Sequence, residues 1–162
     1  MLDKFIKDRR GSGGWLTWIW PKVAVLIVAL MGMGMLFMLY DHIEQIKTSD
    51  KANQIAQEFR NSVLDVYASQ KGIQSQPHIL PDRCRGFEYE MYIVNKTGNL
   101  TGILINAYKD GSSEVYAKGG SSFAVPLDVT FNGGNYTLHN RTNMEVKVNM
   151  TNLGNNVSLR LW

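Results

Sequence analysis

The sequence predicts an α+β fold, in which a long N-terminal helix packs on an antiparallel β-sheet or small β-sandwich. Three observations predict this fold. Residues 23–40 form an uncharged apolar run, apolar residues at helical spacing continue to residue 71, and from residue 87 the spacing changes to a period of two. We expect five segments: a charged and Trp-rich leader at 1–22, a transmembrane helix at 23–40, an amphipathic helical stalk at 41–71, a linker loop at 72–86 and an antiparallel β-domain at 87–162.

The composition is that of a folded protein whose excess charge lies at one end. Of the 162 residues, 44% are hydrophobic and 10% aromatic, which excludes a disordered chain. The net charge is +3, and residues 1–40 account for all of it because they hold five basic and two acidic residues. The remaining chain is neutral, with 12 residues of each sign. A nucleic-acid-binding domain needs a basic face on its folded part, so we expect no nucleic-acid partner.

The run at 23–40 is a candidate membrane span with membrane lipid as its partner. Its 18 uncharged residues extend over roughly 27 Å as a helix, close to the ~30 Å hydrocarbon core. Pro21 suits the first position of a helix, and Lys22 can extend its ammonium group into the lipid headgroups. Tryptophans of the kind that settle at a membrane interface precede them at Trp15, Trp18 and Trp20. The alternative is a helix buried in a protein core.

The flanking charges predict the orientation of the span. Positive residues before the span keep that side in the cytoplasm, so the β-domain is expected outside, on a single-pass cell-membrane protein. A cleaved secretory signal is the competing interpretation. No site of the A-x-A type follows the apolar run, where residues 41–44 read Asp-His-Ile-Glu, so we expect the anchor to be retained.

A helix is expected to continue beyond the span. From Ala52 to Tyr67 the apolar residues follow steps of three, four and one, which places them on one helical face. Gly72 is a natural stop, and prolines follow it. We therefore expect one helix from about Pro21 to Lys71, with its apolar stripe against the β-domain.

The C-terminal part has the alternation and turn spacing of an antiparallel sheet or sandwich. Turn residues at 96–99, 109–112, 119–122 and 132–134 separate the predicted strands. These strands are Phe87–Asn95, Thr101–Tyr108, Glu114–Lys118, Phe123–Thr130, Tyr136–Leu138, Met144–Met150 and Val157–Trp162.

The β-domain is rich in acceptor triplets for N-glycosylation, Asn-x-Ser/Thr. Six occur after residue 94, where chance placement of the same residues gives about two. Several coincide with predicted turns, which tolerate a bulky glycan. The alternative is a polar β-domain that is merely rich in turn residues. The candidate acceptors are Asn95, Asn99, Asn135, Asn140, Asn149 and Asn156.

Catalytic and metal-binding patterns are missing from the sequence. His42, His78 and His139 stand alone, without the spacing of metal ligands. Glu88 and Glu90 share a strand face, and a polar outer face explains them better than a glycosidase pair. No P-loop, nucleotide-binding glycine motif or nucleophile elbow occurs. We expect no enzyme activity, no cofactor and no metal.

Two further features remain open at this point. Gly32 and Gly34 lie inside the span, where glycine allows close approach of another helix but is also an ordinary membrane residue. Cys84 is the single cysteine, which excludes an intrachain disulfide. Its arginine neighbours, Arg83 and Arg85, are of the kind that lower a thiol pKa, so a functional thiol is an alternative to a structural one.

The chain resembles archaeal type IV pilin-like proteins. The likeness rests on the charged leader Lys7–Gly11, the apolar helix, the stalk residues 52–67, the segment Ile79–Pro81 and the strand at 87–95. In that family a prepilin peptidase cuts after the leader glycine, and the helix serves as membrane anchor and filament core. A β-domain, often N-glycosylated, sits on the helix.

The resemblance implies cleavage after Gly11, which leaves Ser12 as the new N-terminus. In the family the helix starts almost at the cut, whereas here two glycines follow Ser12 and Pro21-Lys22 interrupts the apolar run. A basic flank that merely orients a permanent anchor explains residues 9–11 equally well.

The resulting expectation is a non-enzymatic, membrane-anchored surface protein. As a pilin-like subunit it would contribute to a type IV pilus-like filament, its assembly or adhesion, with other pilin-like subunits as partners of its apolar helix. The alternative is a single-span membrane protein whose β-domain is a binding module or an accessory subunit of a cell-envelope complex.

Overall fold

A computed structural model describes residues 13–73, 77–95, 100–128, 135–141 and 145–161. Helix α2 spans Gly13–Ala68, and eight strands follow it. They are β1 (His78–Leu80), β2 (Glu88–Asn95), β3 (Thr101–Tyr108), β4 (Val115–Phe123), β5 (Leu127–Asp128), β6 (Asn135–His139), β7 (Val146–Asn152) and β8 (Val157–Leu161). The chain divides into two units, Met1–Ile43 and Glu44–Trp162. The predicted α+β fold is confirmed.

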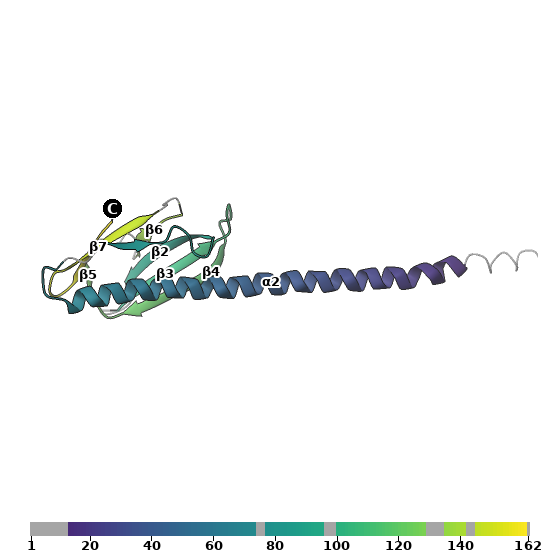
Figure 1. Ribbon diagram of the computed structural model, residues 1–162, viewed down its shortest axis with the longest axis horizontal. Coiled ribbons are helices and arrows are strands. Elements are labelled where there is room, and N and C mark those ends of the chain that lie inside the picture. Colours follow the sequence, from purple (N-terminus) through teal and green to yellow (C-terminus); the bar gives the residue numbers. More distant parts are fainter. Residues whose placement is uncertain (1–12, 74–76, 96–99, 129–134, 142–144, 162) are drawn as a thin grey trace, which may run out of the picture. The chain divides into compact units, whose positions relative to one another are not determined.

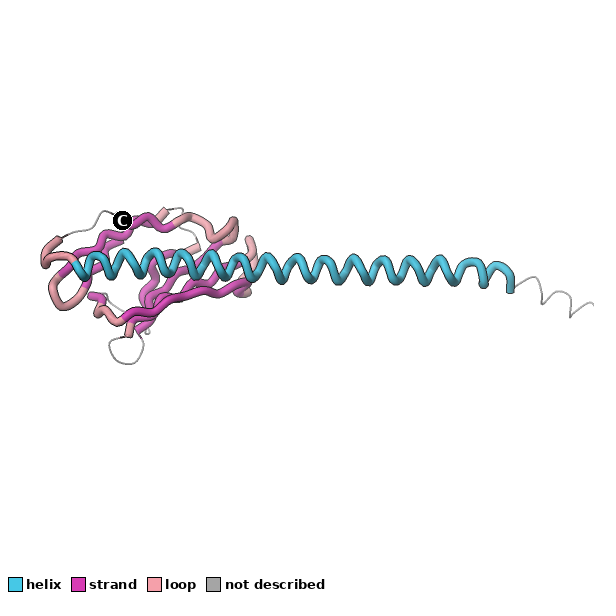
Figure 2. The backbone as a smooth tube through the Cα atoms, turned by 60° about the horizontal axis from the view of Figure 1, so that its bottom comes forward, coloured by secondary structure: helices cyan, strands magenta, loops and turns pink. Residues whose placement is uncertain are grey.

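The second unit contains two four-stranded sheets and the C-terminal part of α2. One sheet has the order β4-β3-β2-β6 and the other β1-β7-β8-β5. All pairs are antiparallel among the described strands except β5 with β8, which are parallel. Figures 1 and 2 show the strands alongside the C-terminal part of α2, and Figure 1 shows β3 and β4 next to it.

The core forms where α2 meets both sheets. The predicted helical stripe is buried from Ala52 to Val66, with Ala52, Phe59 and Val63 fully covered, whereas Tyr67 at its end is exposed. Side chains that alternate along the strands complete the same cluster, including Met91 of β2 and Val148 of β7. The two hydrophobic periods, 3.6 along the helix and 2 along the strands, therefore meet in one core.

Helix α2 begins and ends at different residues from those predicted. It starts at Gly13 and carries Pro21 inside it. Proline removes only the bond to the carbonyl of Thr17, and the neighbouring turns keep their own bonds. The helix stops at Ala68 rather than at Lys71, because Ser69 N–H bonds back to Val66 O at 3.1 Å in a tighter turn.

The expected turn at 119–122 is wrong, because β4 runs through it from Val115 to Phe123. Glycine serves here for close packing rather than for turning. A Cβ added to Gly119 would lie 2.6 Å from the Cβ of Ala52, nearer than two side chains can approach. Gly119 therefore lets β4 pass close to the helix.

The expected linker at 72–86 also contains ordered β-structure. Strand β1 pairs with β7, and the isolated bridge between Cys84 and Phe87 closes a tight turn. Arg85 has a φ of 56° and Gly86 one of 88° in that turn. Leu80 is fully buried, so this segment contributes to the core although its sequence carries the turn residues of a loop.

Candidate functional site

The first unit exposes the predicted membrane segment of α2. By length and composition, α2 contains one span able to cross a membrane, and none of its most apolar 18-residue window is buried within the described chain. The exposed fractions of Val25, Phe37 and Met38 are 69%, 72% and 77%. This exposure favours a membrane span over the alternative of a core helix.

Lys22 is held beside a tryptophan at the start of the span. Its Nζ lies 3.4 Å from the ring centroid of Trp18, which precedes it by one helical turn. A cation over an indole face is a stabilising contact, and it directs the lysine toward the N-terminal end of the helix. The uncharged segment consequently starts after Lys22.

Gly32 and Gly34 leave the helix surface open at the middle of the span. A Cβ added at either position would meet no heavy atom within 4 Å. The surface there is suited to lipid or to a second helix. The predicted cleavage residues Gly11 and Ser12 lie outside the described residues.

The second unit has two distinct ends, defined by the course of α2. At the near end α2 enters the unit, where Glu44 pairs with Arg85 at 3.1 Å and Gln45 Nε2 donates to Tyr116 O. At the far end α2 terminates beside Asn152. Strand β4 runs in the same direction as α2, because successive residues of β4 contact successive turns of the helix.

Three of the glycosylation candidates lie at the far end. Asn95 ends β2, and the pairing of Val94 with Asn135 brings the start of β6 to the same edge of the sheet. Asn156 lies in the turn between β7 and β8, and its carbonyl accepts the Leu153 N–H. Asn99 lies outside the described residues.

The other two candidates occupy different surroundings. Asn140 is exposed after β6, and its Oδ1 accepts the N–H of Arg141 at 2.8 Å. Arg141 in turn donates to Ser112 O at the near end. Asn149 lies within β7, is partly buried and has an Oδ1 without a hydrogen-bond partner among the described residues. An exposed turn accommodates a glycan more readily than the middle of a central strand.

Glu90 forms a closed polar cluster on the sheet, which the sequence pattern did not reveal. Tyr92 and Tyr108 donate their hydroxyl protons to its carboxylate, the latter at 2.6 Å. The Arg141 guanidinium lies 3.3 Å from the centroid of the Tyr108 ring, and its Nε is 3.6 Å from Glu90. Burial, and then the bond to Glu90, raises the pKa of both tyrosines. The carboxylate is thus engaged in holding β2, β3 and the segment after β6 together.

The three histidines have different surroundings. His42 is exposed on α2. His139 is buried, stacks on the Tyr89 ring at 4.1 Å and has its Nδ1 3.1 Å from Tyr89 O. Burial lowers the pKa of His78 and of His139.

One serine–histidine contact was missed in the sequence because its members are far apart along the chain. Ser62 Oγ lies 3.0 Å from His78 Nδ1, but the same hydroxyl donates to the Glu58 carbonyl. That donation leaves Ser62 without a proton for His78 to accept. Within the described residues no group of three or more His, Cys, Asp or Glu is placed to hold a metal ion.

Cys84 is a structural thiol in this fold. It is fully buried, and burial raises the pKa of its thiol to about 11 despite the nearby Lys51. Its Sγ faces the carbonyl of Thr48 at 3.7 Å. The thiolate is the reactive form, so the functional-thiol alternative loses its support.

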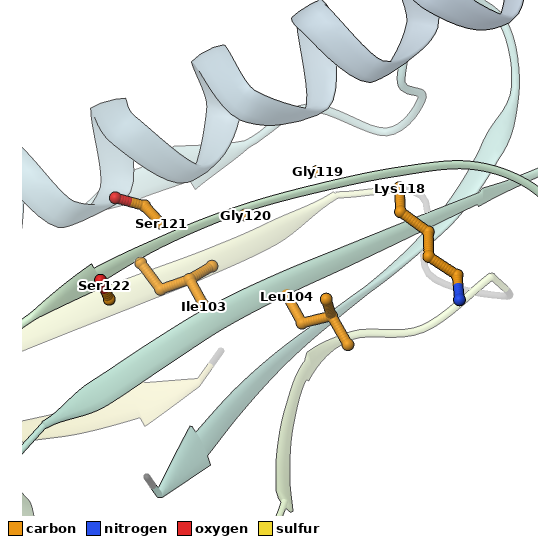
Figure 3. Close-up of a pocket in the computed structure, with 7 residues that line it drawn as sticks. All are labelled: Ile103, Leu104, Lys118, Gly119, Gly120, Ser121 and Ser122. Carbon is orange, nitrogen blue, oxygen red and sulfur yellow. The ribbon is translucent and has the colours of Figure 1, made fainter.

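A shallow depression of about 410 Å³ lies over β3 and β4. Figure 3 shows Leu104 and Lys118 pointing away from the helix there, while Gly119 and Gly120 lie on the strand beside it. Serine, glycine and aliphatic residues make up the rest of the lining, and Lys118 is its single charged group. This composition offers contact surface but no acid–base pair.

Comparison with models of protein families, with characterised proteins and with solved structures gave no match. The likeness to archaeal pilin-like proteins is therefore a prediction made from short motifs. What the structure adds is a long helix with an exposed apolar segment, whose C-terminal part shares one core with the strands that follow it.

Proposed function

We propose that this chain is a non-enzymatic, single-pass surface protein of the type IV pilin-like kind. Its apolar helix anchors it in membrane lipid and associates with other pilin-like subunits, and its β-domain is displayed outside the cell. The exposed, uncharged run at 23–40 carries this proposal. Exposing 18 consecutive uncharged, mostly apolar residues to water is unfavourable in free energy, whereas lipid solvates them. The open surface at Gly32 and Gly34 supports a helix partner.

Leader processing separates a filament subunit from a permanent anchor. A pilin-like subunit is cut by a prepilin peptidase after Gly11, so N-terminal sequencing of the native protein would begin at Ser12. A sequence that begins at Met1 would contradict processing and leave the accessory-subunit alternative. The Lys22–Trp18 contact favours that alternative, since it suits a membrane interface and a lysine is costly inside a dry helical bundle.

The outward topology leads to a proposal about the surface of the β-domain. We expect at least three of the six acceptor asparagines to carry glycans. The exposed Asn140 is expected to be modified and the partly buried Asn149 to be bare. Mass spectrometry of peptides from the native protein measures both sites. An intact mass equal to that of the unmodified polypeptide would contradict the proposal.

A further inference from the structure

Strand β4 has an edge that no other strand covers among the described residues. It is the first strand in the order β4-β3-β2-β6 and pairs with β3 on one side. An edge strand presents N–H and C=O groups that another chain can pair with. Strand β4 spans nine residues, contains no proline and carries one charge, at Lys118. An edge of this kind can pair with a copy of itself.

Three polar side chains of α2 reach this edge of β4. Gln45 Nε2 donates to Tyr116 O at 2.7 Å, and Ser49 Oγ donates to Lys118 O at 2.6 Å. Asn53 Oδ1 accepts the N–H of Gly120 at 2.9 Å. We call Gln45, Ser49 and Asn53 the polar ladder of α2.

The polar ladder works because two spacings coincide. Four residues along a helix advance by about 6 Å, and two residues along a strand advance by about 6.6 Å. Every fourth residue of α2 therefore meets every second residue of β4, and these are the residues whose backbone groups point away from β3. The side chains thus satisfy groups that a further strand would otherwise take.

Close packing keeps the helix within reach of the strand. The missing Cβ of Gly119 makes room for Ala52, which precedes Asn53 in the polar ladder. In Figure 3 Gly119 and Gly120 lie on the strand that passes nearest the helix. Any side chain at Gly119 would move α2 away and lengthen the three hydrogen bonds.

We propose that the polar ladder takes the place of a fifth strand and prevents the β4 edge of one copy from pairing with the β4 edge of a second copy. Two identical edges can pair antiparallel about a two-fold axis, so a second copy is the partner that the polar ladder excludes. Association between copies is thereby left to other surfaces. The inference rests on the second unit alone and does not depend on the proposed function.

The test removes the polar ladder and leaves the core in place. The variant Q45A/S49A/N53A is compared in detergent with wild type and with a control, Gln57→Ala with Asn61→Ala, on the exposed face of the same helix. Light scattering over a range of concentrations should show additional, concentration-dependent association in the ladder variant only. Identical association of all three proteins would overturn the proposal.

A proline in the edge of β4, added to the ladder variant, tests whether the additional association occurs through β4. Lys118→Pro removes an edge N–H without disturbing the pairing with β3, and should return the ladder variant to the wild-type state. Association that persists with proline would overturn the proposal, because it would arise from another surface. Association through the apolar helix is present in wild type and in every variant, so only association in excess of wild type is attributed to the β4 edge.

Hydrogen exchange gives a second readout that does not require the triple variant to fold. The Gly120 amide should be protected in wild type and exchange at least ~10-fold faster in Asn53→Ala, as expected for a lost hydrogen bond of about 1.4 kcal/mol. Equal exchange in both proteins would overturn the proposal, since it would mean that Asn53 does not cover the edge.

Discussion

At the scale of single residues, Asn152 shows how one side chain ends a helix. Its Nδ2 donates to the carbonyls of Val66, Tyr67 and Ser69 at 3.1, 3.1 and 2.7 Å, and its Oδ1 accepts the Gly154 N–H. Val66 and Tyr67 lie in the last turn of α2 and Ser69 follows it, and their carbonyls lack the N–H donors that a further helical turn would bring, although Ser69 N–H also bonds to Val66 O. A side chain from β7 thus satisfies the helix end that Gly72 was predicted to terminate.

Replacing this amide by a carboxylate should be costly. In Asn152→Asp a negative oxygen would face three carbonyl oxygens at the negative end of the helix, so we expect the free energy of unfolding to fall by about 2 kcal/mol or more. The control is Asn155→Asp, an exposed position on the same turn. Thermal unfolding in detergent measures both, and equal melting temperatures would contradict the assigned role.

The buried His139 and the half-buried His78 predict a dependence of stability on pH. Burial lowers the pKa of His139 and His78 in the folded state below the unfolded value near 6.5. As pH falls through 6.5 the unfolded chain binds protons first, so stability is lost between that pH and the lowered folded pKa values. Each histidine contributes a slope of up to about 1.4 kcal/mol per pH unit.

Denaturant titrations at pH 7.5 and pH 5.5 measure this effect. We expect wild type to be less stable at the lower pH, and His139→Gln to show a smaller difference between the two values. His42 is exposed, and its replacement serves as the control. A His139→Gln variant with the wild-type difference would show that His139 is not a source of the pH dependence.

At the scale of elements, the course of β4 depends on the absence of a side chain at Gly119. A Cβ there would lie 2.6 Å from Ala52 Cβ and 2.7 Å from Asn53 N. Gly119→Ala should therefore lower the free energy of unfolding by about 1–3 kcal/mol. The control, Ser121→Ala on the same strand, should change it little. Unfolding curves compare the two, and a neutral Gly119→Ala would contradict the close approach of strand and helix.

The sequence predicted those elements whose signal is local. Alternation located β2, β3 and β7 within two residues, and the helical stripe from Ala52 correctly gave the buried face of α2. The prediction of a turn within β4 was wrong because glycine occurs both in turns and where two backbones pack closely. Only the fold, which places α2 beside Gly119, shows that close packing is the reason here. Strand β1 was missed because its partner, β7, is distant along the chain.

The polar contacts of the second unit could not be predicted from the sequence, because their partners are also far apart along the chain. The Glu90 cluster joins residues 18 apart at Tyr108 and brings in Arg141 from beyond β6, and the Asn152 contacts bridge more than 80 residues. No spacing rule connects such positions. The apolar run at 23–40 and the acceptor asparagines needed no fold to be recognised, because each is defined by consecutive residues.

At the scale of the whole molecule, the proposed function requires that residues 23–40 cross a membrane with the β-domain outside. Cys84 is buried and its thiol pKa is about 11, so the native chain gives little background in thiol labelling. Ser113 lies in an exposed turn before β4. A cysteine introduced there reports directly on which side of the membrane the β-domain lies.

The measurement is the labelling of Ser113→Cys in intact cells with a membrane-impermeant maleimide. Our account predicts that the variant sediments with the membranes and is labelled before permeabilisation, to the same extent as after it. Labelling that appears only once the cells are opened, or a protein recovered in the soluble fraction, would contradict the membrane anchor and the outward display of the β-domain.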